Sequence, residues 1–218
     1  MIHPSTELRF VGPEIGYGVF ATADIPKGTL VYVKDRLEIE VTPRQFDRFD
    51  AAHRAVVEKY SYMDERGVRI LSWDHAKYVN HRCECNTMSA AYGFEIAIRD
   101  IAAGEEITDE YGLFNIDVEV PIACGCRKCR RVLRPDDVQR LHPQWDRKVR
   151  SALGRVRAVP QPLWGFLTPG VGRELDDYLD GRAPYRSVRE LTFDPSPAPQ
   201  PRPRPAGRRA GPASPRAA

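Results

Sequence analysis

Short runs of apolar and aromatic residues alternate with turn signals over residues 8–41. Val, Ile, Phe and Tyr are frequent in these runs, and Gly- and Pro-containing segments at residues 12–13 and 26–28 interrupt them. β-Branched and aromatic residues favour strands, whereas Gly and Pro mark the turns between strands. The first part of the chain therefore predicts antiparallel β-structure.

The apolar spacing becomes helical after this region. Thr42 is a good capping residue, Pro43 suits the first helical position, and Gln45 completes a capping box. Apolar side chains then recur every three or four residues. This pattern predicts one helix over about residues 43–59.

Further short elements follow. Residues 60–62 and 68–71 flank a turn that ends in glycine, which predicts a hairpin. Residues 92–98 alternate apolar and other positions like a strand. Segments 24–28 and 100–104 share the pattern D-I-x-x-G, which indicates two similar turns.

The composition changes towards the C-terminus. Residues 136–156 and 172–179 have helical patterns, with prolines between them. From residue 195 onward there are eight prolines, five arginines and no large apolar residue. Such a segment buries too little apolar surface to offset the entropy of ordering, so we expect a disordered tail.

Composition limits the class of protein. A chain of 218 residues with 42% apolar content suits one main domain. It has no signal-peptide pattern and no run of about 18 apolar residues, so we expect a soluble, intracellular protein. The net charge is +3, and without the five tail arginines it is −2. A nearly neutral body argues against a dedicated nucleic-acid surface, and the tail would add only weak, salt-sensitive polyanion attraction.

The five cysteines fall in two tight groups. Cys83 lies close to Cys85, and Cys124, Cys126 and Cys129 form the second group. In a reducing compartment, such clusters indicate a metal site before they indicate disulfides. Taken singly, each cysteine also fits the role of a small buried apolar residue.

Four segments resemble the signatures of the SET-domain methyltransferase family. Residues 80–86 resemble the motif N-H-x-C-x-x-N, and residues 104–112 resemble G-E-E-[IL]-T-x-x-Y-G. Residues 124–129 resemble a cysteine-rich post-SET tail, and residues 16–21 resemble the opening motif G-x-G-[VL]-[FR]-A. The four occur in the family's order, so the resemblance extends over about residues 8–130.

The resemblance implies a mainly β fold with helical additions. Small curved sheets would be joined by a knot-like threading that brings the Asn80 segment to the Tyr111 segment, and a helical appendage would follow at the C-terminus. The implied domains are a SET domain over 1–116 with a helical insertion at about 43–59, a post-SET-like zinc-binding segment over 117–133, a helical extension over 134–193 and a disordered tail over 194–218.

The resemblance also implies an S-adenosylmethionine-dependent protein-lysine N-methyltransferase. Tyr111 matches the family's catalytic tyrosine, and Tyr60 resembles an aromatic that walls the lysine channel, although a core aromatic at a helix end fits Tyr60 equally well. The cofactor would be held by six residues: Gly16, Tyr17, Gly18, Asn80, His81 and Tyr111. The target amine must be unprotonated, although free lysine has a pKa of about 10.4, and a dry aromatic channel favours the neutral form.

For the metal, the resemblance implies structural zinc held by Cys83, Cys124, Cys126 and Cys129. The sequence departs from the usual pattern here, because the post-SET spacing is short and Cys85 is a second thiol beside Cys83, able to compete for the fourth position. Glu110 stands where an aspartate commonly precedes the tyrosine. The basic residues around the last cysteine, Arg127, Lys128, Arg130 and Arg131, are expected to form a solvated face.

Two other functions stay open. A non-catalytic SET-like module would bind a peptide or protein, but such a module is expected to lose Tyr111, Asn80 or His81, and all three are present. A zinc-cluster nucleic-acid binder is weakened by the neutral body. The expected partner is a protein substrate bearing a lysine, in the cytoplasm of a bacterium or the nucleus of a eukaryote.

Overall fold

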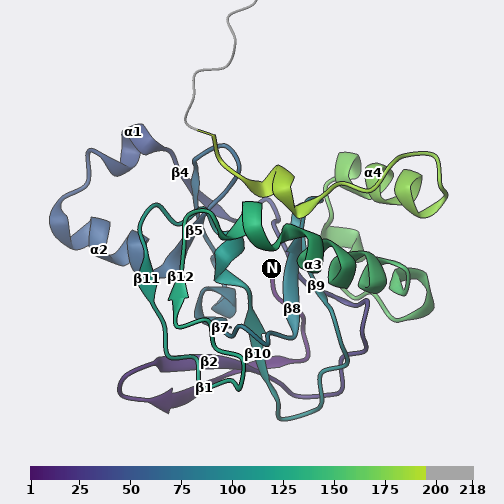
Figure 1. The fold of residues 1–218 in the computed structure, drawn as a ribbon, viewed down its shortest axis with the longest axis horizontal. Helices are drawn as coiled ribbons and strands as arrows, with labels where there is room; N and C mark the ends of the chain where they lie inside the picture. The colour runs from purple at the N-terminus through teal and green to yellow at the C-terminus, as the bar shows by residue number, and fades with distance from the viewer. Residues whose placement is uncertain (195–218) are drawn as a thin grey trace, which may run out of the picture.

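The computed structural model describes residues 1–194, and their N-terminal strands form the predicted antiparallel structure (Figure 1). β1 (Thr6–Gly12) pairs with β2 (Gly16–Ala21) through a tight turn. β2 also pairs antiparallel with β10 (Glu106–Asp109), which in turn pairs in parallel with β7 (Asn80–His81). This sheet, in the order β1-β2-β10-β7, brings three distant motifs of the chain side by side.

Three further small sheets complete the β-structure. β3 (Leu30–Val33), β9 (Phe94–Ala97) and β8 (Thr87–Ala90) form one sheet in that order. β4 (Ile39–Val41), β6 (Arg69–Leu71) and β5 (Ser61–Met63) form another, in which β5 and β6 make the predicted hairpin. β11 (Val120–Pro121) pairs with β12 (Val132–Leu133). The fold is therefore mainly small β-sheets with added helices, as expected.

The single helix predicted over residues 43–59 is wrong, because the chain forms two helices there. α1 (Pro43–Phe46) has the predicted capping box at Thr42. α2 (Ala51–Tyr60) begins at a new N-cap, Asp50, whose carboxylate accepts the His53 N–H at 2.9 Å. An Asp inside a helical pattern competes for backbone N–H groups in this way and starts a new helix.

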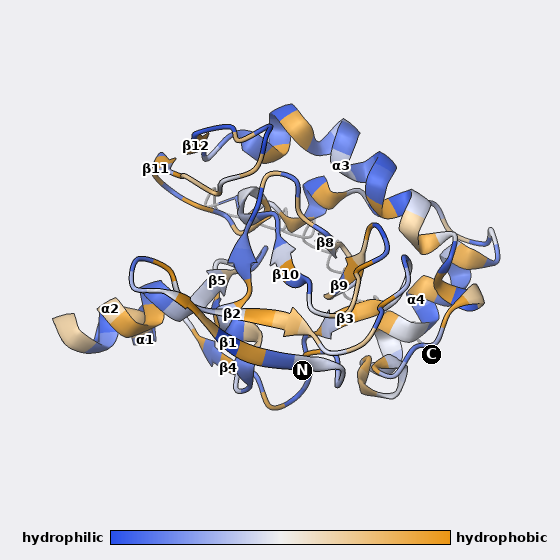
Figure 2. Ribbon diagram, turned by 90° about the horizontal axis from the view of Figure 1, so that it is seen from below, coloured by the Kyte–Doolittle hydropathy of each residue, from blue (hydrophilic) through white to orange (hydrophobic). Residues whose placement is uncertain are grey.

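Two helices lie beyond the last cysteine, close to their predicted positions. α3 (Asp137–Leu153) presents Trp145, which is 1% exposed, to the main apolar core, and Figure 2 shows both apolar and hydrophilic residues around this helix. α4 (Pro169–Leu179) adds Leu175 to the same core. None of the helices in residues 1–194 is long and apolar enough to cross a membrane.

Short 3₁₀ turns complete the described elements, and the list is η1 (His75–Tyr78), η2 (Tyr111–Leu113), η3 (Val156–Ala158), η4 (Trp164–Phe166) and η5 (Val188–Leu191).

The two D-I-x-x-G turns pair with each other. The backbones of Ile25 and Ile101 exchange two hydrogen bonds of 2.9 Å, and Asp24 and Asp100 each accept an N–H from the opposite turn. The predicted tail lies outside the described residues apart from residue 194.

Candidate active site and cysteine cluster

Tyr111 lies where β10 ends, next to the end of β7. The parallel pairing of Thr108 with Asn80 and of Asp109 with His81 brings the two motif segments together. The Tyr111 hydroxyl donates a hydrogen bond of 2.6 Å to the carbonyl oxygen of Val79. Burial, reinforced by the negative charge of Asp109, raises the pKa of Tyr111, so its hydroxyl keeps its proton.

A cavity of about 490 Å³ opens beside Tyr111. Tyr60, the last residue of α2, lines it together with Tyr111, and its ring meets that of Tyr78 edge to face at 5.4 Å. Tyr62 and Phe114 add two more aromatic side chains. The structure therefore brings the two predicted catalytic residues to one cavity, which is lined by aromatic, aliphatic and charged side chains.

The predicted cofactor residues of the first motif contact the second motif. The side-chain amide of Asn80 donates to the carbonyl oxygen of Tyr17 at 3.1 Å and to Glu106 at 2.8 Å. Gly16 adopts a φ of +87°, which favours glycine. A Cβ on Gly18 would lie 2.6 Å from the Glu106 carboxylate and 3.0 Å from the Asn80 amide. A larger residue at Gly18 would therefore have to displace these two side-chain ends.

Gly16, Tyr17, Gly18 and Asn80 do not line the 490 Å³ cavity. Tyr111 and Val79 do line it. Asn80 follows Val79 directly, and Tyr111 reaches Val79 with its hydroxyl. The 79–80 backbone therefore separates the cavity from the surface formed by Gly16, Tyr17 and Gly18.

His81 connects the backbone of Tyr111 with the cysteines. Its Nδ1 lies 3.0 Å from the carbonyl oxygen of Asp109 and 3.2 Å from the Tyr111 nitrogen, and its Nε2 lies 3.3 Å from the Cys83 sulfur. Burial lowers the pKa of His81, which favours the neutral imidazole. The His81 ring therefore links the cysteines to the Tyr111 backbone, so a displacement of the cysteines would be passed to Tyr111 through this ring.

The cysteine cluster is centred on Cys83 and Cys124. Their sulfur atoms are 3.8 Å apart, and the Cys126 sulfur lies 3.3 Å from that of Cys124. A tetrahedron with zinc–sulfur bonds of about 2.3 Å has edges of about 3.8 Å, so the separation of the Cys83 and Cys124 sulfurs fits zinc. The ligand atoms of His81, Cys83 and Cys124 lie within 4.8 Å of one another. The sulfur of Cys129 instead lies 3.8 Å from the carbonyl oxygen of Ile122.

Cys85 is separate from this cluster. It is 4% exposed and belongs to the apolar core that contains Met88 and Trp145. Burial raises the pKa of its thiol well above the usual value. Within the described residues it therefore has the environment of a buried apolar residue, while Cys83 faces the post-SET segment.

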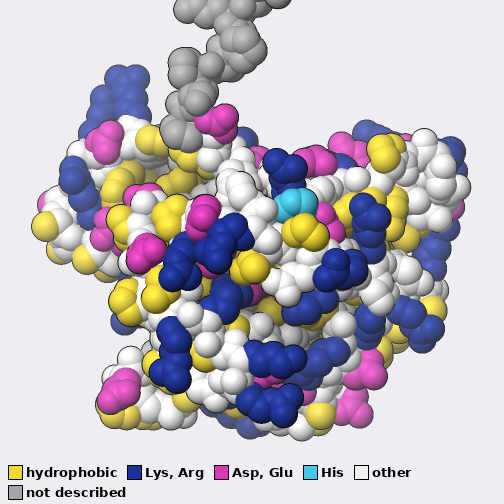
Figure 3. Space-filling view, viewed as in Figure 1, with side chains coloured by type: hydrophobic (Ala, Val, Ile, Leu, Met, Phe, Trp, Pro, Cys, Tyr) yellow, Lys and Arg dark blue, Asp and Glu magenta, His cyan; other side chains and the backbone are white. Residues whose placement is uncertain are grey.

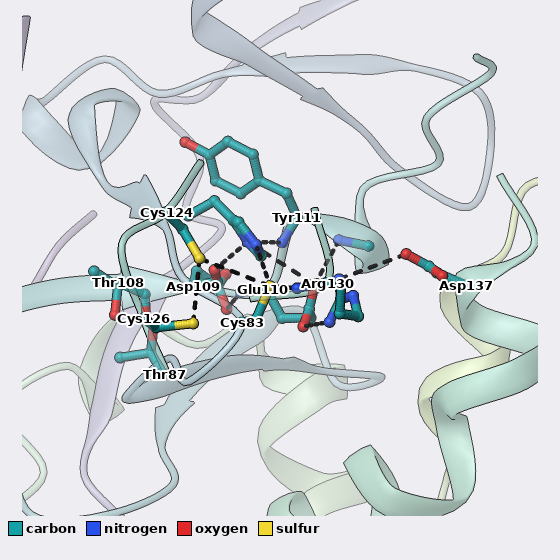
Figure 4. A network of polar contacts seen from close by, with 12 residues as sticks. Cys83, Thr87, Thr108, Asp109, Glu110, Tyr111, Cys124, Cys126, Arg130 and Asp137 are labelled. Atoms are coloured by element: carbon teal, nitrogen blue, oxygen red, sulfur yellow. Dashed lines mark hydrogen bonds and ion pairs between the residues drawn. The ribbon is translucent and has the colours of Figure 1, made fainter. Parts of the chain in front are cut away.

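Arg130 is the main residue that sequence reasoning missed. Both terminal nitrogens of its guanidinium bond the carboxylate of Glu110, at 2.6 Å each (Figure 4). The Glu110 side chain is 0% exposed and that of Arg130 21%, so the prediction of a solvated Arg130 is wrong. The Arg130 backbone N–H also points to the Cys83 sulfur at 3.4 Å, and its side chain lies 3.5 Å from Asp137 of α3. The sequence contains only one sign of this ion pair, the acidic residue Glu110 directly before Tyr111.

The region that contains β2, β7, β10 and Tyr111 matches a known protein family. Residues 16–112 match the family model described as the SET domain. Residues 16–112 form a SET domain. The domain includes Tyr111, the β7 segment and Cys83, whereas the other three clustered cysteines follow it in the chain.

The curated relatives of this SET domain are histone-lysine methyltransferases. Histone-lysine N-methyltransferase trr of Drosophila melanogaster is 30% identical over 131 residues, covering 53% of this chain and 5% of that protein. Histone-lysine N-methyltransferase 2D of Homo sapiens is 28% identical over 128 residues, covering 53% of this chain and 2% of that protein. The chain therefore matches only a small part of these much longer relatives.

A solved structure is similar at lower identity. It is described as the crystal structure of KRYPTONITE in complex with mCHG DNA and SAH, and it aligns with a TM-score of 0.41 and 21% identity. The alignment covers 59% of this chain and 28% of that one.

Proposed function

We propose that this protein is an S-adenosylmethionine-dependent protein-lysine N-methyltransferase. The observation that carries the proposal is Tyr111, which stands at the end of β10 in a SET domain and borders the aromatic cavity that also contains Tyr60. The relatives are named as histone-lysine N-methyltransferases, which supports the same reaction class. The proposed substrate is a protein that offers a lysine side chain to the cavity.

The chain's own residues would position the reactants. S-adenosylmethionine, when bound, supplies an electrophilic methyl group on a sulfonium. We propose that Gly16, Tyr17, Gly18, Asn80, His81 and Tyr111 hold it. The aromatic cavity wall would exclude water from the incoming lysine side chain, which favours the neutral amine. Tyr111, protonated and fixed to Val79, orients the amine without acting as a base.

The cysteine cluster has a structural role in this proposal. Four thiolates, from Cys83, Cys124, Cys126 and Cys129, would hold zinc and fix the segment after the SET domain against His81 and Glu110. Burial raises the pKa of the Cys83 thiol to about 12, so a bound cation is needed to keep its thiolate at neutral pH.

The test separates cofactor binding from transfer. Isothermal titration of the zinc-loaded protein with S-adenosylmethionine is expected to give micromolar binding, and a variant with Asn80→Ala and His81→Ala is expected to lose it. Mass spectrometry of histones incubated with protein and cofactor then detects methylated lysine. Tyr111→Phe should retain cofactor binding and lose transfer. A folded, zinc-loaded protein that does not bind the cofactor would exclude the enzyme and favour a peptide-binding module.

A further inference from the structure

Two carboxyl side chains, from Glu95 and Asp109, line the inner wall of the cavity that contains Tyr111. Glu95 lies in the central strand β9 and is 9% exposed, and Asp109 ends β10 and is 1% exposed. The two carboxyls are close enough to shift each other's pKa. The cavity, where the family resemblance implied an aromatic channel, thus also contains a buried pair of acids.

Among residues 1–194 no lysine, arginine or histidine forms an ion pair with these two carboxyls, and the N-terminal ammonium, which lowers the pKa of Glu95, is itself paired with Asp35 and Glu38. One oxygen of Asp109, Oδ1, accepts the Glu110 N–H at 2.7 Å, and the other, Oδ2, has no hydrogen-bond donor in the described chain. Glu95 can supply a donor to Asp109 in its protonated form. The adjacent Glu110 differs sharply, because Arg130 satisfies both of its oxygens.

The basic residues that border the cavity are directed elsewhere. Lys77 donates to the carbonyl oxygen of Asp74 at 2.9 Å. The Arg69 guanidinium lies 4.6 Å from the centre of the Phe46 ring, and the Lys59 ammonium 5.1 Å from that of Tyr60. None of the three forms an ion pair with Glu95 or Asp109.

The charge state of the pair follows from its burial. Burial and the neighbouring Asp109 raise the pKa of Glu95 well above its usual value, and burial raises the pKa of Asp109 to about 6. Near neutral pH the pair therefore shares about one proton and carries about one negative charge. A buried charge without a partner is costly unless a ligand neutralises it.

We propose that Glu95 and Asp109 bind the cationic amino group of the target side chain at the inner end of this cavity. The proposal rests on the proposed methyltransferase function, and it names the group that receives the substrate's charge. The aromatic wall, in which Phe114 lies 5.1 Å from Tyr62 and 5.3 Å from Tyr111, suits the alkyl stem of the same side chain.

The pair also gives the ammonium proton a destination. An ammonium, R–NH3⁺, passes one proton to the singly protonated pair, which becomes neutral and doubly protonated, and the neutral amine R–NH2 retains its lone pair. That lone pair can then attack the methyl carbon of the bound sulfonium, so that the N–C bond forms as the C–S bond breaks, a neutral thioether leaves and the product is a methylammonium. The two acids return the extra proton to solvent after the product leaves. Tyr111 keeps its own proton throughout.

The test uses n-butylammonium, which reproduces the end of a lysine side chain, and uncharged 1-butanol of similar shape. NMR titration of the full chain at pH 7.5 should show butylammonium binding at least tenfold tighter than butanol. Glu95→Gln and Asp109→Asn keep the side-chain shapes and should each weaken butylammonium binding at least tenfold while leaving butanol binding unchanged. Glu58→Gln removes an exposed acid from the same cavity and should change neither.

Three results would overturn the cation site. These are equal binding of the two probes by the unsubstituted protein, full butylammonium affinity in both pair variants, or an equal loss in Glu58→Gln. Near-UV circular dichroism of each variant checks that the fold is retained.

Cofactor titration of the same variants keeps the two proposals separate. If the probes behave as expected but S-adenosylmethionine does not bind, the cation site stands and the methyltransferase fails. If cofactor binding and lysine transfer occur without discrimination between the probes, the cation site alone fails. Where transfer occurs, Asp109→Asn should raise KM for the protein substrate and leave cofactor affinity unchanged.

Discussion

Replacing Arg130 by alanine tests whether the segment after the SET domain is structurally joined to the Tyr111 loop. Arg130 neutralises Glu110, whose side chain is 0% exposed and whose Oε1 also accepts the Gly112 N–H at 3.0 Å. Arg130→Ala would leave that carboxylate buried without its cation. The loss of folding stability is therefore mainly the cost of leaving the Glu110 carboxylate buried without a cation.

The magnitude follows from the burial of the two partners. Removing one member of a buried ion pair costs about 3–5 kcal/mol. Arg130 is 21% exposed, so water can partly replace it, and we expect about 3 kcal/mol. For a domain of this size, that loss lowers Tm by about 6–12 °C. The exposed pair of Arg134 with Glu119, whose side chains are 38% and 64% exposed, is the matched control, and Arg134→Ala should cost less than about 1 kcal/mol.

Thermal and urea unfolding of the zinc-loaded variants measure both losses. The double variant Glu110→Gln with Arg130→Ala should be more stable than Arg130→Ala alone, because the abandoned charge is gone. A Tm shift for Arg130→Ala no larger than that for Arg134→Ala would refute the reasoning, since Glu110 would then not depend on Arg130. Equal stability of the single Arg130 variant and the double variant would have the same meaning.

Three further predictions concern single residues. Cys124→Ser should reduce bound zinc from about one per chain to well below one, measured by elemental analysis, and Cys85→Ser should leave zinc content unchanged. Burial raises the pKa of Asp109 from its ordinary 3.8 to about 6, so this group destabilises the fold increasingly as pH rises from about 4 to 6. Asp109→Asn should therefore gain about 3 kcal/mol at pH 7.5 and little at pH 4, compared by chemical unfolding. Gly18→Ala should lower Tm by several degrees, because its Cβ would meet the Glu106 carboxylate at 2.6 Å and the Val11 side chain at 2.9 Å, whereas an Ala at half-buried Gly12 meets nothing within 4 Å.

Local chemistry predicted the elements whose cause is local. The capping box at Thr42, the β5–β6 hairpin and the positions of α3 and α4 follow from residues that lie within a few positions of each other. The break before α2 was missed because Asp50 fits both a helix and an N-cap, and only its hydrogen bond to His53 decides between them.

The site depended more on pairing across the chain. Motif order predicted that the Asn80 and Tyr111 segments belong together, but not that β7 and β10 pair in parallel. Glu95 alternates with apolar neighbours, a pattern typical of a solvent-facing position, yet β9 is the central strand of its sheet and is buried on both faces. Neither local spacing nor composition contains that information.

The positions of basic side chains were likewise not predictable from the sequence. The nearly neutral charge of the body argued against a dedicated nucleic-acid surface, yet Lys and Arg side chains gather in the middle of one face, with acidic ones among and around them (Figure 3). Arg130 was expected on such a face, and its partner Glu110 lies 20 positions earlier in the chain. Charge counts along a sequence therefore do not distinguish a solvated arginine from one that neutralises a buried acid.

The three consecutive residues Asp109, Glu110 and Tyr111 explain how this site is assembled. Successive side chains at a strand end point in different directions, so Asp109 lines the cavity with Glu95 while Glu110 turns to Arg130 and the cysteine segment. Tyr111 returns to the cavity and bonds Val79. A disturbance of the cysteines thus reaches Tyr111 along the backbone, through Glu110 and through His81, without involving the side chains of Glu95 and Asp109. Loss of metal should accordingly misplace the tyrosine while the cavity keeps its acidic pair, which separates positioning of the reaction from recognition of the substrate's charge.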